Sequence, residues 1–241
     1  MGRKHIFQFF LPVLILILLV TGLLIRKGRR APVFAPTRIP EATLVIDAGH
    51  GGEDGGAVSP SGVVESHINL AVAQRLKGLM DLCGVKAVML RESDISLHNA
   101  DCDTLRQKKV SDLHNRVAAI EETPNSILIS IHQNTFQSKK YHGAQVFFGT
   151  NEDSLALAQF AQDSLREGLD PVNSRVPAQI PSSVYLMKHI TCPAILVECG
   201  FLSNPTEEGL LQTPSYQTKI AMSLTCAYLN YQHTEKEGEI P

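Results

Sequence analysis

Hydrophobic residues form short continuous runs that recur along most of the chain. The run SILISI at residues 126–131 is an example, and such runs are typical of strands that are buried on both faces of a sheet. We expect strands at residues 43–47, 85–90, 126–131, 144–148, 184–187 and 194–198. Several of these runs end in a polar residue followed by loop-type sequence, which marks the carboxyl end of the predicted strand.

Between the runs, hydrophobic residues recur with the period of a helix. In residues 67–83, Ile68, Val72, Leu76 and Leu79 fall on one helical face. Further helices are predicted at 111–122, with Ser111 as N-cap, at 151–168 and at 214–231. The alternation predicts a single α/β domain, with a central, mostly parallel or mixed sheet of about six strands flanked by helices.

The first 41 residues have a different pattern. Residues 1–5 are basic, and residues 6–25 form an apolar run of the length that crosses a bilayer, which predicts an uncleaved transmembrane signal anchor, with a cleaved export signal as the alternative. Residues 26–41 are basic and then proline-rich, as in a linker. The folded domain is expected at 42–231, followed by a polar tail at 232–241.

Charge and cysteine content exclude some classes of function. The formal net charge of −2 gives no electrostatic reason to expect nucleic-acid binding. The five cysteines are odd in number and contain no C-x-x-C pair, so they form neither a zinc-ribbon pattern nor an evident disulfide framework. More basic residues follow the apolar run than precede it, which by the positive-inside rule would place the domain in the cytoplasm.

Three reactive side chains stand at the exits of three predicted strands. His50 follows the first strand, His132 follows SILISI, and Glu198 ends AILVE. Ligands bind at the carboxyl ends of strands in open α/β sheets, so these side chains are expected to meet there. Two imidazoles and a carboxylate form a common catalytic zinc set, which leaves one position free for water or substrate.

The carboxylate of this set has two candidates. Glu53 lies three residues after His50, in a glycine-rich loop that allows positive φ and close approach of the backbone. Glu65 directly precedes a predicted helix, whose N-terminal N–H groups can orient a carboxylate. The helix terminus favours Glu65, and Glu53 remains the alternative.

Five motifs taken in order extend the picture. DAGHGG-x-D-x-G, G-x-V-E before a helix, R-E-S-D, S-I-H-x-N and V-E-x-G-F-L-S-N-P resemble those of the zinc-dependent N-acetylmuramoyl-L-alanine amidases of bacterial cell walls. The resemblance runs from about residue 43 to 230 and is strongest to the germination-specific, spore-cortex branch. It implies a fold of the zinc-hydrolase type and hydrolysis of the amide between N-acetylmuramic acid and L-alanine in peptidoglycan, as a step towards muramic lactam.

The resemblance also implies a role for each site residue. His50, Glu65 and His132 would bind Zn²⁺ and Glu198 would be catalytic. Arg91, Asp94 and Arg116 would match structural positions. Three other functions stay open: a zinc carboxypeptidase-like wall peptidase with Glu53 as ligand, a thiol hydrolase with Cys199 as nucleophile and His132 or His189 as base, and a non-catalytic peptidoglycan-binding module.

The expected partners follow from the substrate. Glycan strands with stem peptides lie outside the cytoplasmic membrane, so we expect an extracytoplasmic domain that is anchored by residues 6–25, against the charge count, or secreted if the signal is cleaved. An accessory protein for activation or metal loading is a further expectation. Only about ten residues separate His132 from the strand AQVFF, too few for a helix that blocks the site, so the pocket is expected to be open.

Overall fold

The computed structural model describes residues 42–237, and the predicted anchor at 6–25 lies outside them. The elements in order are β1 (Thr43–Ala48), α2 (Glu65–Leu82), β2 (Ala87–Met89), α3 (Leu105–Glu121), β3 (Ser126–Asn134), β4 (Gln145–Phe148), α4 (Ser154–Leu169), β5 (Ala178–Gln179), α5 (Tyr185–His189), β6 (Ala194–Phe201), α6 (Pro205–Leu211) and α7 (Pro214–Glu237). Among the helices of these residues, none has the length and hydrophobicity to cross a membrane.

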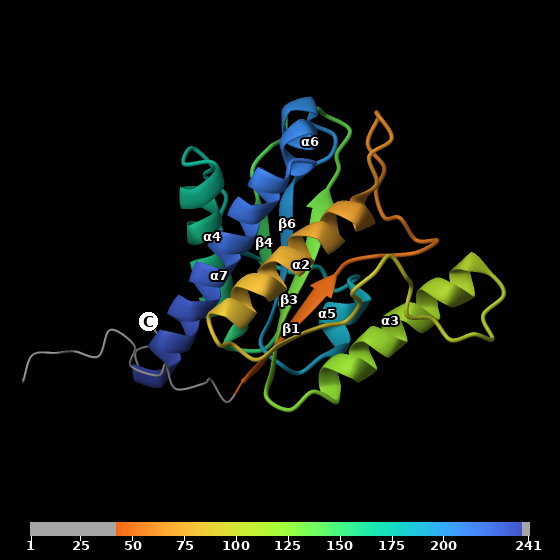
Figure 1. Cartoon of the computed structure of the whole chain (residues 1–241), viewed down its shortest axis with the longest axis horizontal. Coiled ribbons are helices and arrows are strands. Elements are labelled where there is room, and N and C mark those ends of the chain that lie inside the picture. The colour runs from red at the N-terminus through yellow and green to blue at the C-terminus, as the bar shows by residue number, and fades with distance from the viewer. Residues whose placement is uncertain (1–41, 238–241) are drawn as a thin grey trace, which may run out of the picture. The chain divides into compact units, whose positions relative to one another are not determined.

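The strands form one sheet in the order β2-β1-β3-β6-β4-β5. The pairs β1–β2, β1–β3 and β3–β6 are parallel, and β4 runs antiparallel to β6 (Figure 1). This confirms the expected six-stranded mixed sheet. Because β1, β3 and β6 are parallel neighbours, their carboxyl ends lie at one edge, where the candidate site residues follow.

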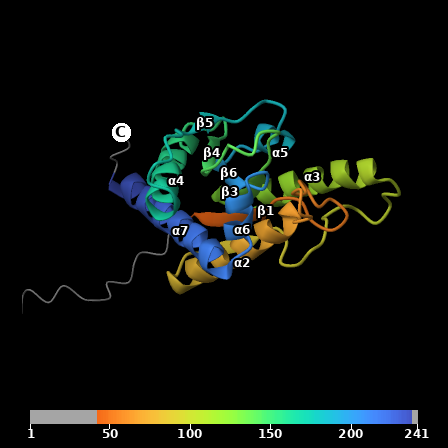
Figure 2. The ribbon, with the colours of Figure 1, turned by 90° about the horizontal axis from the view of Figure 1, so that it is seen from above.

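Helices cover both faces of the sheet (Figure 2). On one face, α2, α4 and α7 bury the larger hydrophobic cluster, which includes Ile46, Ile129 and Val197. On the other face, α3 and α5 cover a smaller cluster that contains Val45, Leu128 and other strand residues. Burial on both faces explains why the central strands read as continuous hydrophobic runs in the sequence.

Several elements differ from the sequence expectation at their ends, and one differs in type. Helix α7 runs on to Glu237, into the predicted polar tail, and β3 and β6 run on to Asn134 and Phe201. Helix α3 begins at Leu105, six residues before the predicted start, because Thr104 and Gln107 form a capping box there. Of residues 184–187, predicted as a strand, Val184 is the N-cap of the short helix α5 and the other three lie within that helix. The sixth strand is the two-residue β5, and neither β5 nor α6 was predicted.

The prediction of a strand at 184–187 is wrong for a physical reason. Four apolar residues in a row fit a strand or a buried helical turn equally well, and tertiary packing decides between them. Here Leu186, Met187 and Ile190 all face the smaller cluster, a spacing that only a helical turn provides.

Candidate active site

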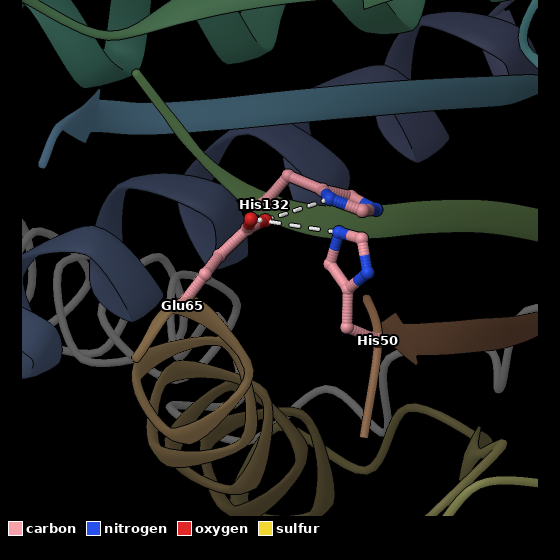
Figure 3. Close-up of side chains that lie close together, drawn as sticks. All are labelled: His50, Glu65 and His132. Carbon is pink, nitrogen blue, oxygen red and sulfur yellow. Dashed lines mark hydrogen bonds and ion pairs between the residues drawn. The ribbon is translucent and has the colours of Figure 1, made fainter. Parts of the chain in front are cut away.

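Three side chains from three elements converge at the carboxyl edge of the sheet (Figure 3). His50 lies just after β1, Glu65 is the first residue of α2, and His132 lies within β3. Glu65 Oε1 is 2.9 Å from His132 Nδ1, and Glu65 Oε2 is 3.5 Å from His50 Nε2. One ligand atom of each residue lies within 4.8 Å of the others, so the group can hold a metal ion.

Two glycines leave the space that this convergence needs. A Cβ atom on Gly49 would lie 2.3 Å from the His132 ring. A Cβ atom on Gly56 would lie 2.5 Å from Glu65 Oε2 and 2.6 Å from the His50 ring, and Gly56 also has a φ of +72°. Any larger residue would displace a ring or the carboxylate. These contacts explain at two positions why the loop after β1 is rich in glycine.

Glu65 is fixed from several directions besides the histidines. Its Oε2 accepts a hydrogen bond from the Ala57 N–H at 2.8 Å, and its Oε1 accepts from the Gln133 N–H at 3.1 Å and from Asn69 Nδ2 at 3.2 Å. Burial alone would raise the pKa of Glu65, but the hydrogen bond and charge of His132 lower that pKa to about 2. The carboxylate is therefore ionised and immobile, as a metal ligand must be.

His50 is held in a backbone conformation that histidine rarely adopts. Its φ is 60°, and its carbonyl accepts a hydrogen bond from Arg116 Nη2 at 2.8 Å. Its Nδ1 lies 3.0 Å from a carboxylate oxygen of Asp54, whose other oxygen is 3.1 Å from Lys109. A proton on Nδ1 leaves the Nε2 lone pair free on the side of Glu65, which is the tautomer that a metal requires.

Two buried arginines hold the glycine-rich loop after β1 in place. The guanidinium of Arg116 forms ion pairs with Asp47 and Asp112. Arg91 donates to the carbonyls of Ala48 at 2.8 Å and Gly49 at 3.0 Å. Both arginines are about 2% exposed, so they act as internal supports, in agreement with the structural role that the resemblance implies.

Glu198 lies across the β3–β6 ladder from His132 and lines the same cavity. The cavity has a volume of about 330 Å³, and Leu113, Tyr185 and Leu186 form its wall on the side of α3 and α5. One carboxylate oxygen of Glu198 is buried and has no hydrogen-bond partner. Burial raises the pKa of Glu198 to about 7, against the lowering effect of His132. A carboxyl group that titrates near neutrality can both accept and donate a proton.

The alternative residues lie elsewhere. Glu53 is exposed and pairs with Lys108 at 2.5 Å, outside the group of three. Cys199 is fully buried in the cluster under α2 and α7, its thiol donates towards the Val197 carbonyl, and burial raises its pKa. His189 is stacked on Tyr185, with ring centroids 3.9 Å apart. The geometry therefore brings together His50, Glu65, His132 and Glu198 and leaves these three out.

Sequence reasoning did not identify Asp54, Asn69 or Gln133 as supports of the site. Asp54 lies four residues after His50 inside the glycine-rich loop and is the second Asp of the motif DAGHGG-x-D-x-G, which gives it a position but no role. Asn69 lies one helical turn after Glu65 on α2, where it donates to Glu65 and to the Gly49 carbonyl. The segment between β3 and β4 contains no helix, in agreement with the expected open pocket.

An α/β sheet with two imidazoles and two carboxylates at its carboxyl edge defines a hydrolase with a candidate metal centre. Residues 44–228 match the family model of N-acetylmuramoyl-L-alanine amidase, and the chain belongs to this family.

Two comparisons give the degree of similarity. The germination-specific N-acetylmuramoyl-L-alanine amidase of Bacillus subtilis is 39% identical over 199 residues, which cover 82% of each chain. The solved CwlD amidase from Clostridioides difficile, in complex with the GerS lipoprotein, is 36% identical, with a TM-score of 0.77 over 80% of this chain and 99% of that one. A second amidase structure, from Clostridium difficile 630, is 25% identical, with a TM-score of 0.71.

Proposed function

We propose that this chain is a zinc-dependent amidase that removes stem peptides from spore-cortex peptidoglycan. The observation that carries the proposal is the group of His50, Glu65 and His132 beside the unpartnered carboxylate of Glu198. The similarity to a germination-specific amidase supports the cortex as the place of action.

The donor set fits zinc. Two imidazoles that give up any extra proton on binding and one ionised carboxylate are ligands that zinc accepts in catalytic sites, and both histidines remain partly exposed. Zinc bound there would supply a Lewis acid that polarises an amide carbonyl and acidifies a water molecule. Asp54 would keep the proton of His50 on Nδ1, and Asn69 and Gln133 would hold Glu65 in place.

Glu198 would act as the general base and then as the general acid. Its carboxylate lines the cavity, where it would accept the proton of the attacking water and deliver it to the leaving amine of L-alanine. The products are a free lactyl carboxyl group on the muramic acid and a stem peptide with a new N-terminal amine. Burial raises the pKa of Glu198 to about 7 in the metal-free site, and a cation bound nearby would lower it and favour the ionised form that acts as base.

The location of the substrate supports an extracytoplasmic domain tethered by residues 6–25. We also infer an accessory protein, because the similar Clostridioides difficile amidase was solved in complex with a lipoprotein. An open site with three protein ligands holds zinc less firmly than a closed four-ligand site, so such a partner would act on metal retention or on substrate placement.

The test is to incubate the full 241-residue chain with cortex-type peptidoglycan, with zinc or with a chelator, and to analyse the fragments by mass spectrometry. We expect stem peptides that begin with L-alanine, released only when zinc is present. Glu198→Gln, which keeps the size of the side chain, serves as the inactive control. Cleavage within the stem peptide would favour a wall peptidase, zinc-independent cleavage would favour the thiol alternative, and binding without cleavage would favour a non-catalytic module.

A further inference from the structure

Two large aromatic side chains stand exposed beside the catalytic cleft. Phe136 and Tyr141 lie in the loop between β3 and β4, and 55% and 46% of their surfaces are exposed. They are the two large exposed Phe or Tyr side chains of residues 42–237. Exposed aromatic residues grouped on one loop are uncommon without a binding role, because they cost solubility.

The two rings form the outer part of an ordered stack. The Tyr141 ring lies 6.2 Å from the buried Phe201 ring in a stacked arrangement, and the Phe136 ring meets Tyr141 edge-on at 4.8 Å. The guanidinium of Arg175 lies 5.1 Å above the same Phe201 ring. Phe201 is the last residue of β6, so the stack is anchored to the strand that carries Glu198. We call Phe136, Tyr141 and Phe201 the aromatic shelf.

The segment FLSNP after Glu198 fixes the loop that carries the shelf. Ser203 Oγ accepts from the Phe136 N–H at 3.0 Å, and Asn204 Nδ2 donates to the Tyr141 carbonyl at 3.3 Å. The buried Glu207 accepts from the N–H groups of Gly143 at 2.9 Å and Phe201 at 2.8 Å. None of these contacts involves the metal group. The segment FLSNP therefore holds the loop between β3 and β4 in one conformation.

The aromatic shelf continues the catalytic cleft on the same face of the sheet. Gln145 pairs with Glu198 across β4 and β6, and its side chain donates to the Val176 carbonyl at 2.8 Å. Arg175, next to Val176, covers Phe201, which places the stack on the Glu198 side. Phe136 follows His132 by four residues, so the two lie at most about 13 Å apart along the backbone. A glycan strand whose scissile amide lies at the metal group therefore reaches the aromatic shelf over the length of a short oligosaccharide.

We propose that the aromatic shelf binds the glycan strand of peptidoglycan next to the sugar whose amide is cleaved. The inference rests on the proposed function, since the amide joins the stem peptide to a glycan that continues past the site. A pyranose ring has an apolar C–H face that packs on an aromatic ring and a rim of hydroxyl groups that suits nearby polar groups. Arg175 lies over the Phe201 ring, and the exposed Lys139 and Lys140 belong to the same loop as Phe136 and Tyr141.

The test measures binding separately from cleavage. Zinc-loaded full chain and the variant F136A/Y141A are titrated with glycan strands stripped of stem peptides, in a series of lengths. We expect wild-type affinity to rise with strand length, and the variant to bind long strands about tenfold more weakly, as the loss of one or two ring contacts implies. On intact wall polymer the variant should show a similar rise in KM with little change in kcat.

Two further variants keep the outcome clear. F136L/Y141L preserves apolar bulk without planar rings and should lose glycan affinity as well, so a folding defect of the alanine variant does not decide the result. L82A, at the far end of α2, removes an apolar side chain that is even more exposed and should bind as wild type does. Equal glycan affinities of wild type and both shelf variants would overturn the proposal. Failure of the amidase function itself would appear separately, as wild type that binds strands and releases no stem peptide.

Discussion

Removal of the Arg116 guanidinium should both destabilise the fold and lower the affinity of the site for zinc. The side chains of Arg116 and Asp47 are 3% and 2% exposed, so solvent does not screen their ion pair. R116M leaves the Asp47 carboxylate buried with only the Ser130 hydroxyl, at 2.6 Å, as a partner. Breaking one side of a buried pair costs about 3–5 kcal/mol, and we expect a loss of that size in the free energy of unfolding at pH 7.

The pH dependence gives the same prediction a second readout. In the wild type, Arg116 holds the pKa of Asp47 below its usual value against the effect of burial, so the pair contributes stability above the unfolded pKa of 3.8 that is lost as pH falls through the folded pKa. In R116M, burial raises the pKa of Asp47, and the penalty disappears when the carboxyl is protonated. The difference in stability between the two proteins should therefore shrink as pH falls from 7 towards 4.

Urea unfolding of the metal-free proteins, in the presence of a chelator, measures the loss of stability. Competition with a chelator for zinc measures the loss of metal affinity. Arg116 also binds the His50 carbonyl, so R116M should bind zinc roughly 10- to 100-fold more weakly, as other losses behind a metal ligand do. D47N/R116M removes both charges of this pair and should recover much of the stability, because Asp112 keeps its hydrogen bonds from Ser96 and the Leu97 N–H. K77M breaks the exposed pair with Asp81 and should cost about 0.5 kcal/mol or less. A loss below 1 kcal/mol in R116M would refute the reasoning.

Three further predictions concern the site itself. E65Q should lose most bound zinc while E53Q keeps it, and metal analysis showing the reverse would favour the Glu53 ligand set. E198Q should retain zinc and lose turnover by a factor of roughly 10² or more, and near-normal turnover would remove Glu198 from the mechanism. C199S should keep wall-amidase activity, since the thiol is buried in the opposite cluster, and an inactive, folded, zinc-loaded C199S would revive the thiol nucleophile.

The sequence predicts best those elements whose local hydrophobic pattern fits only one type of secondary structure. The strands β1, β3 and β6 are hydrophobic runs buried on both faces, and each was placed at its observed start. The start of α3 was missed because residues 105–110 are largely polar and their helical state depends on the capping box at Thr104. The run at 184–187 has no period long enough to choose between strand and helix, so only its packing against Leu196 and its neighbours decides.

The candidate site was predictable to a similar extent and for a similar reason. His50, His132 and Glu198 follow from one rule, that parallel strands deliver their exits to one edge. The choice between Glu65 and Glu53 depends on how the glycine-rich loop folds back, which places Ala57 against Glu65 and turns Glu53 towards Lys108. Supports such as Arg116, which reaches the loop across 66 residues of sequence, have no local signature.

Because one oxygen of Glu198 is buried without a hydrogen-bond partner, the ionised carboxylate should destabilise the metal-free protein. Its folded pKa of about 7 lies above the ordinary 4.5, so the folded state binds more protons than the unfolded state between these values. Stability should therefore fall as pH rises from 4.5 through 7, and the full penalty above pH 7 is at most about 3 kcal/mol for a shift of this size. E198Q removes the titrating group, so the chelated variant should be more stable than chelated wild type at pH 8 and similar to it near pH 4. Urea unfolding across this range tests the point. E53Q is the exposed control: Lys108 lowers the pKa of Glu53, so its removal shifts the pH profile in the opposite sense to E198Q. Parallel pH profiles for wild type and E198Q would show that the buried carboxylate is compensated, and would weaken the case for Glu198 as a group held ready for proton transfer at a cost in stability.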